Sequence, residues 1–299
     1  MMNYYKSCVL CPRNCRVDRR KTTGFCGRSD ILTAAKAYLH KWEEPCISGE
    51  NGSGTVFFSG CNLRCVYCQN REIASGHAGV NITAERLSEI FLEQQERGAE
   101  NINLVTPTHY VPHIIAALDA VRGKLKIPVV YNCGGYESID TLRMLEGYVN
   151  IYLPDFKYMD TAIASRYSAA PDYPQYAKAA VKEMVRQTGA CKFDENGIMT
   201  GGTIVRHLVL PSYTQNSKSV VEYLYKTYGN DIYMSIMNQY TPLPYVGAYP
   251  EINRRLTDSE YDEVISFAAD LGVENAYVQE GGTVSESFIP VFDGGGIAK

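Results

Sequence analysis

Three cysteines on one short loop are the residues of this sequence best suited to chemistry. They lie in the segment FFSGCNLRCVYCQN at Cys61, Cys65 and Cys68, with the spacing C-x3-C-x2-C. Three thiolates can hold three corners of a cubic iron–sulfur cluster, and the missing fourth ligand leaves one iron open to a small molecule. The spacing therefore predicts a reaction site.

Two structural explanations of this triplet are weaker. A closed electron-transfer cluster or a tetrahedral zinc site needs four protein ligands, so it would have to recruit Cys46, Cys133 or another distant residue. Buried structural cysteines do not require this spacing, and the loop is polar at Asn62, Arg64 and Gln69. An open cluster loop accounts for both observations.

A short strand is expected to deliver this loop. Residues 55–58 (TVFF) are β-branched and aromatic, which is typical of a buried strand, and the turn-like residues 50–54 precede them. The strand is expected to end at Ser59 and Gly60, so the cysteine loop leaves its carboxyl end. Tyr67, directly before the last cysteine, offers an aromatic face on which a ligand base could rest.

Four more cysteines stand close together near the start of the chain. Cys8, Cys11, Cys15 and Cys26 have the spacing C-x2-C-x3-C-x10-C, which suffices to close a coordination shell. Zinc would take the four thiolates tetrahedrally and stabilise a segment without its own core, whereas a [4Fe–4S] cluster would take the same four and could pass electrons. The spacing predicts a metal site and leaves zinc and iron–sulfur open.

The three remaining cysteines carry no such pattern. Lone cysteines are most often small buried hydrophobes, and we expect this of Cys133 and Cys191. Cys46 is given no role.

The chain after the cysteine loop alternates helices and strands. Six strand–helix units imply an α/β fold with a parallel sheet, which right-handed crossovers curl into a partial (β/α)6 TIM-like barrel whose active face lies where the strands end. After the first strand, strands are expected at residues 101–105, 127–131, 149–153, 203–210 and 232–236, and helices at 83–98, 111–121, 138–145, 173–187, 217–228 and 258–271.

Three regions are expected along the chain. Residues 1–45 form a short Cys-rich N-terminal metal-binding appendage, residues 46–285 form the partial barrel, and residues 286–299 form a C-terminal tail. Asp293 and the three glycines after it predict that this tail is flexible.

Composition indicates a reduced intracellular enzyme. With 299 residues the chain can bury a large core, and its net charge of −4 gives no electrostatic case for binding nucleic acid or a membrane. Ten cysteines would suggest disulfides in a secreted protein, but the start MMNYYKSCVL lacks the apolar core of a signal peptide and no segment approaches membrane length. We therefore expect a cytoplasmic protein with metal-bound cysteines, and oxygen-sensitive clusters favour an anaerobic setting.

The cysteine spacing together with Tyr67 resembles the signature of radical S-adenosylmethionine (SAM) enzymes, C-x3-C-x-aromatic-C after the first barrel strand. Within that superfamily the chain is similar, from about residue 8 to about residue 280, to the pyruvate formate-lyase activating enzyme homologues of the PflX type. The closer resemblance lies in residues 11–15 (CPRNC), 43–45 (EEP), 48–49 (SG), 52–55 (GSGT), 101–109 (NINLVTPTH), 131–132 (YN), 154–157 (PDFK) and 206–211 (RHLVLP).

The resemblance implies a [4Fe–4S] cluster on the three cysteines, with SAM bound at its open iron and cleaved reductively to a 5′-deoxyadenosyl radical. Polar residues at the strand ends are then the candidates for contacts with SAM. These are Tyr67, Thr106, Thr108, Asn132, Asp155, Lys157, Arg206 and His207. Thr106 and Thr108 stand where members of the superfamily usually carry a Gly-Gly-Glu-like segment, and hydroxyls can accept the same hydrogen bonds.

Several of these residues have a second explanation. Asp155 and Lys157 resemble an Asp-x-Lys pair at the active face of activating enzymes, but an ordinary ion pair is the alternative. Arg206 in a buried parallel strand needs an anion, which a carboxylate of SAM, of a substrate or of Asp155 would provide. His109 fits a structural role as well as a catalytic one.

Two enzymatic functions and one binding function follow. In the first, the protein generates a glycyl radical on a partner protein; in the second, the radical acts on a small molecule or another peptide. Either would draw electrons from a flavodoxin- or ferredoxin-type donor. Residues 237–240 (MNQY) differ from the histidine-containing segment of pyruvate formate-lyase activating enzymes, which argues against assuming the same substrate. The third, a non-enzymatic zinc-binding module, is disfavoured because a three-thiolate site is incomplete as a structural site.

Overall fold

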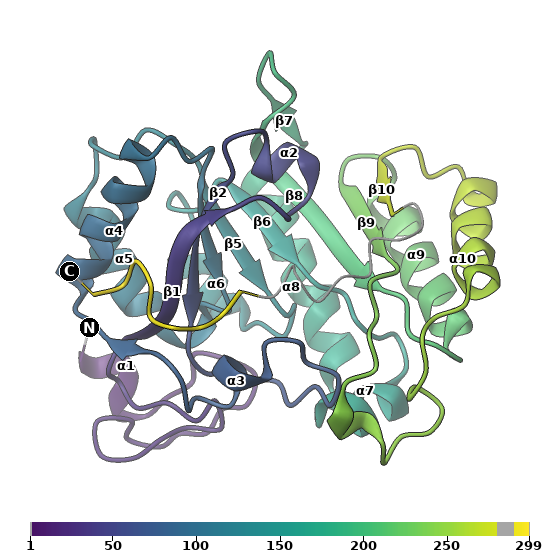
Figure 1. Ribbon diagram of the computed structural model, residues 1–299, viewed down its shortest axis with the longest axis horizontal. Coiled ribbons are helices and arrows are strands. Elements are labelled where there is room, and N and C mark those ends of the chain that lie inside the picture. The colour runs from purple at the N-terminus through teal and green to yellow at the C-terminus, as the bar shows by residue number, and fades with distance from the viewer. Residues whose placement is uncertain (1, 280–289, 299) are drawn as a thin grey trace.

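The computed structural model describes residues 2–279 and 290–298. Its centre is one curved sheet with the strand order β10-β9-β8-β6-β5-β4-β2-β1-β3, and β7 pairs with β8 outside this path (Figure 1). All neighbours from β2 to β10 along this order are parallel, whereas β1 is antiparallel to β2 and β3. The strands are β1 (Thr33–His40), β2 (Ser53–Phe58), β3 (Val80–Asn81), β4 (Ile102–Val105), β5 (Val129–Cys133), β6 (Ile151–Pro154), β7 (Lys192–Phe193), β8 (Met199–Leu208), β9 (Tyr233–Met237) and β10 (Ala276–Val278).

Helices link the parallel strands and cover the sheet. Figure 1 shows α4 and α5 beside one end of the sheet and α9 and α10 beside the other. The helices are α1 (Met2–Lys6), α2 (Pro45–Ser48), α3 (Arg71–Ala74), α4 (Ala84–Glu96), α5 (Val111–Ala120), α6 (Ile139–Met144), α7 (Thr161–Ser168), α8 (Tyr173–Thr188), α9 (Thr214–Tyr228) and α10 (Asp258–Leu271), with 3-10 turns η1 (Thr108–Tyr110) and η2 (Pro244–Val246). None of the helices in the described residues combines the length and apolar character needed to cross a membrane.

Local sequence explains why these elements form where they do. The Thr83 side chain accepts a hydrogen bond from the Arg86 amide and caps α4, whose Leu87, Ile90 and Phe91 are fully buried. The central strands β2, β4, β5 and β6 are buried along their whole length, as expected for a parallel sheet covered on both faces. Apolar strand runs and amphipathic helices therefore build the alternating pattern.

The predicted α/β fold with a mostly parallel sheet is confirmed. The six predicted strands correspond to β2, β4, β5, β6, β8 and β9, and the sheet remains open because β10 and β3 stand at opposite ends of the strand order. Every parallel strand therefore ends on the same side of the sheet, which is where the loop after β2 begins.

The sheet begins earlier in the chain than predicted. β1 lies within the region assigned to the N-terminal appendage, yet it pairs antiparallel with β2 from Ala34 to His40. Its sequence, TAAKAYLH, is rich in alanine and offers few of the β-branched residues that mark a strand. The part of the N-terminal region that precedes the sheet therefore ends before Thr33, not at residue 45.

The prediction of a flexible tail at residues 293–296 is wrong. The Gly294 amide donates to the Ala35 carbonyl, and the Ala37 amide donates to the Gly295 carbonyl, so this segment pairs with the edge of β1. Ile297 is fully buried in the core next to α4. Backbone pairing and one buried isoleucine outweigh the glycines' flexibility. Residues 286–289 of the predicted tail lie outside the described residues.

Candidate active site

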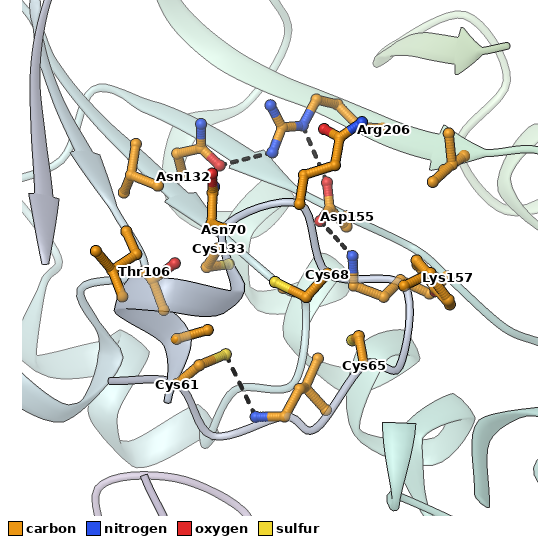
Figure 2. Close-up of a pocket in the computed structure, with 18 of the residues that line it drawn as sticks. Cys61, Cys65, Cys68, Asn70, Thr106, Asn132, Cys133, Asp155, Lys157 and Arg206 are labelled. Atoms are coloured by element: carbon orange, nitrogen blue, oxygen red, sulfur yellow. Dashed lines mark hydrogen bonds and ion pairs between the residues drawn. The ribbon is translucent and has the colours of Figure 1, made fainter. Parts of the chain in front are cut away.

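A cavity opens at the carboxyl ends of the parallel strands, where the cysteine loop crosses them (Figure 2). Its walls come from the loop after β2 and from the ends of β4, β5, β6, β8 and β9. The polar and sulfur-bearing residues of the lining are Cys61, Cys65, Tyr67, Cys68, Gln69, Asn70, Thr106, Asn132, Cys133, Asp155, Lys157, Arg206, Met237 and Gln239. The topology thus gathers side chains from positions 61 to 239 around one space.

The cysteine loop is held at several points along its length. The Asn62 side chain donates to the Tyr136 carbonyl at 2.6 Å, and the amides of Arg64 and Val66 donate to the carbonyls of Ser168 and Tyr167. The loop therefore leaves β2 in a fixed conformation, and Cys61, Cys65 and Cys68 all line the cavity.

The three cysteines fit a metal cluster by their chemistry. Burial, together with repulsion between neighbouring thiolates, raises the pKa of Cys61 and Cys68 to about 12. As free thiols, Cys61 and Cys68 stay protonated at neutral pH, so a cationic group is needed to hold these two as thiolates. No three His, Cys, Asp or Glu side chains of the described residues are placed to bind a single metal ion. The case for a cluster rests on three sulfur donors of one loop that line one cavity.

A network of opposite charges forms the wall facing the cysteines. The Arg206 guanidinium lies 3.0 Å from Asp155 Oδ1 and 3.0 Å from Glu43 Oε2, and it donates to Asn132 Oδ1 at 2.6 Å. Lys157 Nζ lies 2.6 Å from Asp155 Oδ2. Figure 2 shows this chain from Asn132 through Arg206 and Asp155 to Lys157 above the cysteine loop. Arg206 therefore already has protein anions as partners.

The two cations keep Asp155 ionised. Burial opposes the charge of Asp155, but Lys157 and Arg206 outweigh it and hold the pKa of that carboxyl below its ordinary value. The pKa of Lys157 is raised, because the attraction of Asp155 outweighs the effect of burial. The cavity wall therefore presents fixed charges of both signs.

Glu43 is a site residue whose role the sequence did not reveal. It lies on the loop between β1 and α2, and its Oε1 accepts hydrogen bonds from the side chains of Asn103 at 3.1 Å and Asn132 at 3.2 Å. A buried guanidinium such as that of Arg206 needs an anion, and Glu43 and Glu44 directly precede α2. These two facts together could have suggested Glu43 as its partner.

Comparison with known proteins gives one family match, which covers the cysteine loop and part of the sheet. The family model for the radical SAM superfamily matches residues 55–187, which include the cysteine loop and the ends of β4, β5 and β6. The cysteine spacing and the open parallel sheet agree with this match. Both support the radical SAM superfamily.

The proteins that this chain resembles are distant from it in sequence. An uncharacterized protein of Methanocaldococcus jannaschii is 28% identical over 286 residues, which cover 92% of this chain and 78% of that protein. Among solved structures, Streptococcus suis SuiB bound to the precursor peptide SuiA has a TM-score of 0.51 at 14% identity, covering 74% of this chain and 46% of SuiB. The FeFe-hydrogenase maturase HydG from Carboxydothermus hydrogenoformans has a TM-score of 0.52 at 12% identity, covering 73% and 50%. The chain spans about half the length of these structures, which show a shared fold.

Six of the eight residues predicted to contact SAM line the cavity at the cysteine loop. They are Tyr67, Thr106, Asn132, Asp155, Lys157 and Arg206. Thr106 has a left-handed backbone with φ of 58°, a conformation that is costly for a non-glycine residue and often found at functional sites. Tyr67 is largely buried, and its hydroxyl lies 2.5 Å from that of Tyr158. An adenine contact of Tyr67 would therefore use its ring.

The predicted SAM contact of His207 is not supported by its position. Its Nδ1 lies 2.7 Å from the Phe156 carbonyl oxygen and its Nε2 lies 2.9 Å from Ser217 Oγ, away from the cavity lining. Successive residues of a strand point to opposite faces. Because Arg206 faces the cavity, the adjacent His207 packs behind the sheet.

Thr108 also does not line the cavity. It begins the turn η1, and its hydroxyl donates to Glu137 Oε1 at 2.8 Å beneath β5. Its predicted contact with SAM is therefore not supported either. His109, the next residue, is buried with Nε2 2.8 Å from the Ser59 carbonyl oxygen, and burial lowers its pKa to about 3. A neutral, packed imidazole favours the structural role.

Glu137 should make the free energy of unfolding fall as pH rises. Burial raises the pKa of Glu137 to about 7 from an ordinary value of 4.5. The unfolded chain releases this proton between these two values while the folded chain keeps it, so stability present at low pH is lost as pH rises through 7. From pH 5 to pH 8 the loss is expected to be about 2–3 kcal/mol. Urea unfolding of the wild type and Glu137→Gln should show this loss in the wild type alone; equal slopes would contradict it.

Gly135, in the loop after β5, is required for close packing of backbone. Its φ is +75°, and a Cβ there would lie 2.0 Å from the Asp155 carbonyl oxygen. Gly123 has a φ of +85° with nothing within 4 Å of its Cβ position, so Gly123→Ala is the matched control. Both substitutions cost about 1–2 kcal/mol of left-handed strain. Gly135→Ala is expected to lower the free energy of unfolding by about 1–3 kcal/mol more, from overpacking. Equal losses in urea unfolding would contradict this.

The N-terminal cysteine segment packs directly on the cysteine loop. Arg13 Nε donates to the Asn62 carbonyl at 2.8 Å, and the guanidinium groups of Arg13 and Arg64 both lie over the Phe25 ring. Cys8, Cys11 and Cys26 are buried, and Cys15 is partly exposed. The segment therefore supports the loop that carries Cys61, Cys65 and Cys68.

The remaining cysteines lie in apolar surroundings. Cys46 is buried beside Ile47, and Cys191 is partly buried against the same cluster. Cys133 is buried in the main core, although it also borders the cavity at the cysteine loop. The prediction that Cys133 is a small buried hydrophobe agrees with this position, and Cys191 retains partial exposure.

Proposed function

We propose that this protein is a radical SAM enzyme that cleaves SAM reductively and uses the resulting radical on a peptide. The observation that carries the proposal is the convergence of Cys61, Cys65 and Cys68, three thiols of one loop, on a cavity walled by the polar ends of five parallel strands. These three cysteines would hold a [4Fe–4S] cluster. When bound, such a cluster holds SAM at its open iron and supplies the electron that releases a 5′-deoxyadenosyl radical.

The chain's own residues would hold and orient SAM. Lys157 and Arg206 place positive charge at the cavity wall, where a carboxylate can bind, and Asp155 places negative charge where an ammonium or hydroxyl group can bind. Asn132 is almost fully buried and presents an amide to the same space. Leu63, Ile73 and Phe58 line the apolar part of the cavity and keep water from a reactive radical.

A peptide is the substrate class that we propose, and one structure with a similar fold supports it. SuiB, which shares the fold, is described with a bound precursor peptide. Within that class we propose hydrogen abstraction from a glycine of a partner protein, as in glycyl-radical activating enzymes of the PflX type, with electrons from a flavodoxin- or ferredoxin-type donor. The alternative is radical modification of another peptide or a small molecule.

The test begins with anaerobically reconstituted protein, SAM and a strong reductant. Release of 5′-deoxyadenosine is expected. Zinc at both cysteine sites, together with no release of 5′-deoxyadenosine, would contradict the proposed enzymatic function. A glycyl-radical signal in electron paramagnetic resonance with a glycyl-radical protein present would support the first substrate, and turnover of SAM without such a signal would favour the alternative.

We also propose a second metal centre, zinc or a [4Fe–4S] cluster, at Cys8, Cys11, Cys15 and Cys26. Support comes from Arg19, which is fully buried and donates to the carbonyls of His109 and Arg28. Its guanidinium also donates to Cys8 Sγ at 3.9 Å, and among the described residues no carboxylate forms an ion pair with it. A buried cation needs a counter-charge, and metal-bound thiolates would provide one.

Metal content separates the two forms of this second centre. Iron, sulfide and zinc would be measured in the wild type and in the Cys8/Cys11/Cys15 triple-alanine variant. Loss of about four irons would assign a cluster, and loss of about one zinc would assign a structural zinc. Unchanged content of all three would reject the second centre.

A further inference from the structure

A chain of hydroxyl groups ends on one of the three cluster cysteines. Cys65 Sγ lies 2.9 Å from Ser168 Oγ, Ser168 Oγ lies 2.7 Å from the Tyr158 hydroxyl, and the Tyr158 hydroxyl lies 2.5 Å from that of Tyr67. Ser168 and Tyr158 are fully buried, and Tyr67 is 6% exposed. The chain runs through an apolar cluster that includes Leu63. Water therefore cannot replace these hydrogen bonds at low cost.

The direction of donation in this chain is fixed by Cys65. A metal-bound thiolate has no proton and can only accept, so the Ser168 hydroxyl must donate to Cys65 Sγ. Each hydroxyl carries one proton, so Ser168 Oγ accepts from Tyr158 and Tyr158 accepts from Tyr67. All the O–H dipoles then point toward the sulfur, and each hydrogen bond polarises the next.

The backbone holds Ser168 against the cluster loop. Ser168 is the last residue of α7. The next residue, Ala169, caps the helix in the left-handed backbone conformation. The Ser168 carbonyl accepts from the Arg64 amide, and the Tyr167 carbonyl accepts from the Val66 amide. The residues on both sides of Cys65 are thus tied to the end of α7, which fixes the distance between Ser168 Oγ and Cys65 Sγ.

We propose that Ser168 is a positioning residue that raises the reduction potential of the cluster by donating a hydrogen bond to Cys65 Sγ. The inference rests on the proposed function, because it requires the cluster. Reduction adds negative charge to the cluster and its sulfur ligands, so a donor dipole aimed at one sulfur stabilises the reduced form more than the oxidised form. Tyr158 polarises the Ser168 hydroxyl by donating to it, and Tyr67 polarises Tyr158 in the same way. Tyr67 itself lies between Cys65 and Cys68 in the cysteine loop.

The test is a potentiometric titration of the reconstituted protein without SAM, followed by electron paramagnetic resonance. Ser168→Ala is expected to make reduction about tenfold less favourable, a shift of about 59 mV to lower potential for one electron. Tyr158→Phe leaves the Ser168 donor in place and should shift the potential in the same direction by less. Ser168→Thr keeps the hydroxyl and should retain the wild-type potential.

Ser165→Ala is the matched control, because Ser165 is exposed on the same helix and touches no cysteine of the loop. It should leave the potential unchanged. The signal to follow is the one that disappears in the Cys61/Cys65/Cys68 triple-alanine variant, so a second cluster cannot be mistaken for it.

The outcomes separate this inference from the proposed function. If the wild type binds no iron at Cys61, Cys65 and Cys68, the proposed function fails and the inference fails with it. If Ser168→Ala binds the wild-type amount of iron at an unchanged potential, the inference alone is overturned. A lower potential in Ser168→Ala, with Ser168→Thr and Ser165→Ala unchanged, supports it.

Discussion

Replacing Cys61, Cys65 and Cys68 together by alanine is expected to abolish the release of 5′-deoxyadenosine from SAM. The three thiols are the sulfur ligands that the cysteine loop offers to the cavity, so their removal leaves nothing on this loop to bind iron. Iron content should fall by about four per chain, in line with the stoichiometry of one cubic cluster. The measurement is product formation under anaerobic conditions together with iron and sulfide analysis of the same samples.

A cysteine outside the loop supplies the control. Cys191 lies near β7 and β8 with its thiol 3.5 Å from the Thr203 carbonyl oxygen, and it does not line the cavity. Cys191→Ala should retain both the iron and the product. Undiminished turnover by the triple-alanine variant would show that the reactive cluster lies elsewhere.

Replacing Arg206 by methionine is expected to lower the free energy of unfolding of the metal-free protein by about 3–5 kcal/mol. Arg206 is 16% exposed and is the shared cation of Asp155 and Glu43, whose side chains are 18% and 9% exposed. Its removal leaves Glu43 without an ion-pair partner and Asp155 with Lys157 alone. Breaking a buried ion pair on one side costs far more than its net contribution, because the remaining charge stays desolvated.

Arg122→Met is the matched control for this substitution. Arg122 is 72% exposed and pairs at 3.7 Å with Asp119, which is 51% exposed, so its loss should cost less than about 1 kcal/mol. Urea unfolding followed by circular dichroism would compare the two variants with the wild type. Equal small losses for both would contradict a buried charge network at Arg206. A variant that accumulates only in an unfolded form would agree with the predicted loss.

The sequence was most informative where the determining residues are neighbours in the chain. Cys61, Cys65 and Cys68 fall within eight residues, so their spacing alone predicts the loop. The central parallel strands are continuous apolar runs, which makes them visible without the structure. The alanine-rich β1 lacks that signal, because its place in the sheet is set by pairing with β2 and not by its own propensity.

Residues that depend on distant partners could not be assigned from the sequence. Glu43 and Arg206 are 163 positions apart, and their ion pair follows from the way the loop after β1 enters the barrel. The error at His207 has a different cause. The end of a predicted strand locates a residue at the correct edge of the sheet. It does not fix the face, because a shift of one residue moves a side chain to the opposite face. Arg206 and His207 are adjacent, and only the first faces the cavity.

The outer edge of β1 is not left open to other chains. Gly294 and Gly295 exchange backbone hydrogen bonds with Ala35 and Ala37, and a Cβ at Gly296 would lie 2.1 Å from the Ala37 carbonyl oxygen. Unpaired strand edges are templates for strand addition by another molecule. The last described residues cover this edge, so a chain cut before residue 293 is expected to expose the Ala35 carbonyl and the Ala37 amide to strand addition by another molecule.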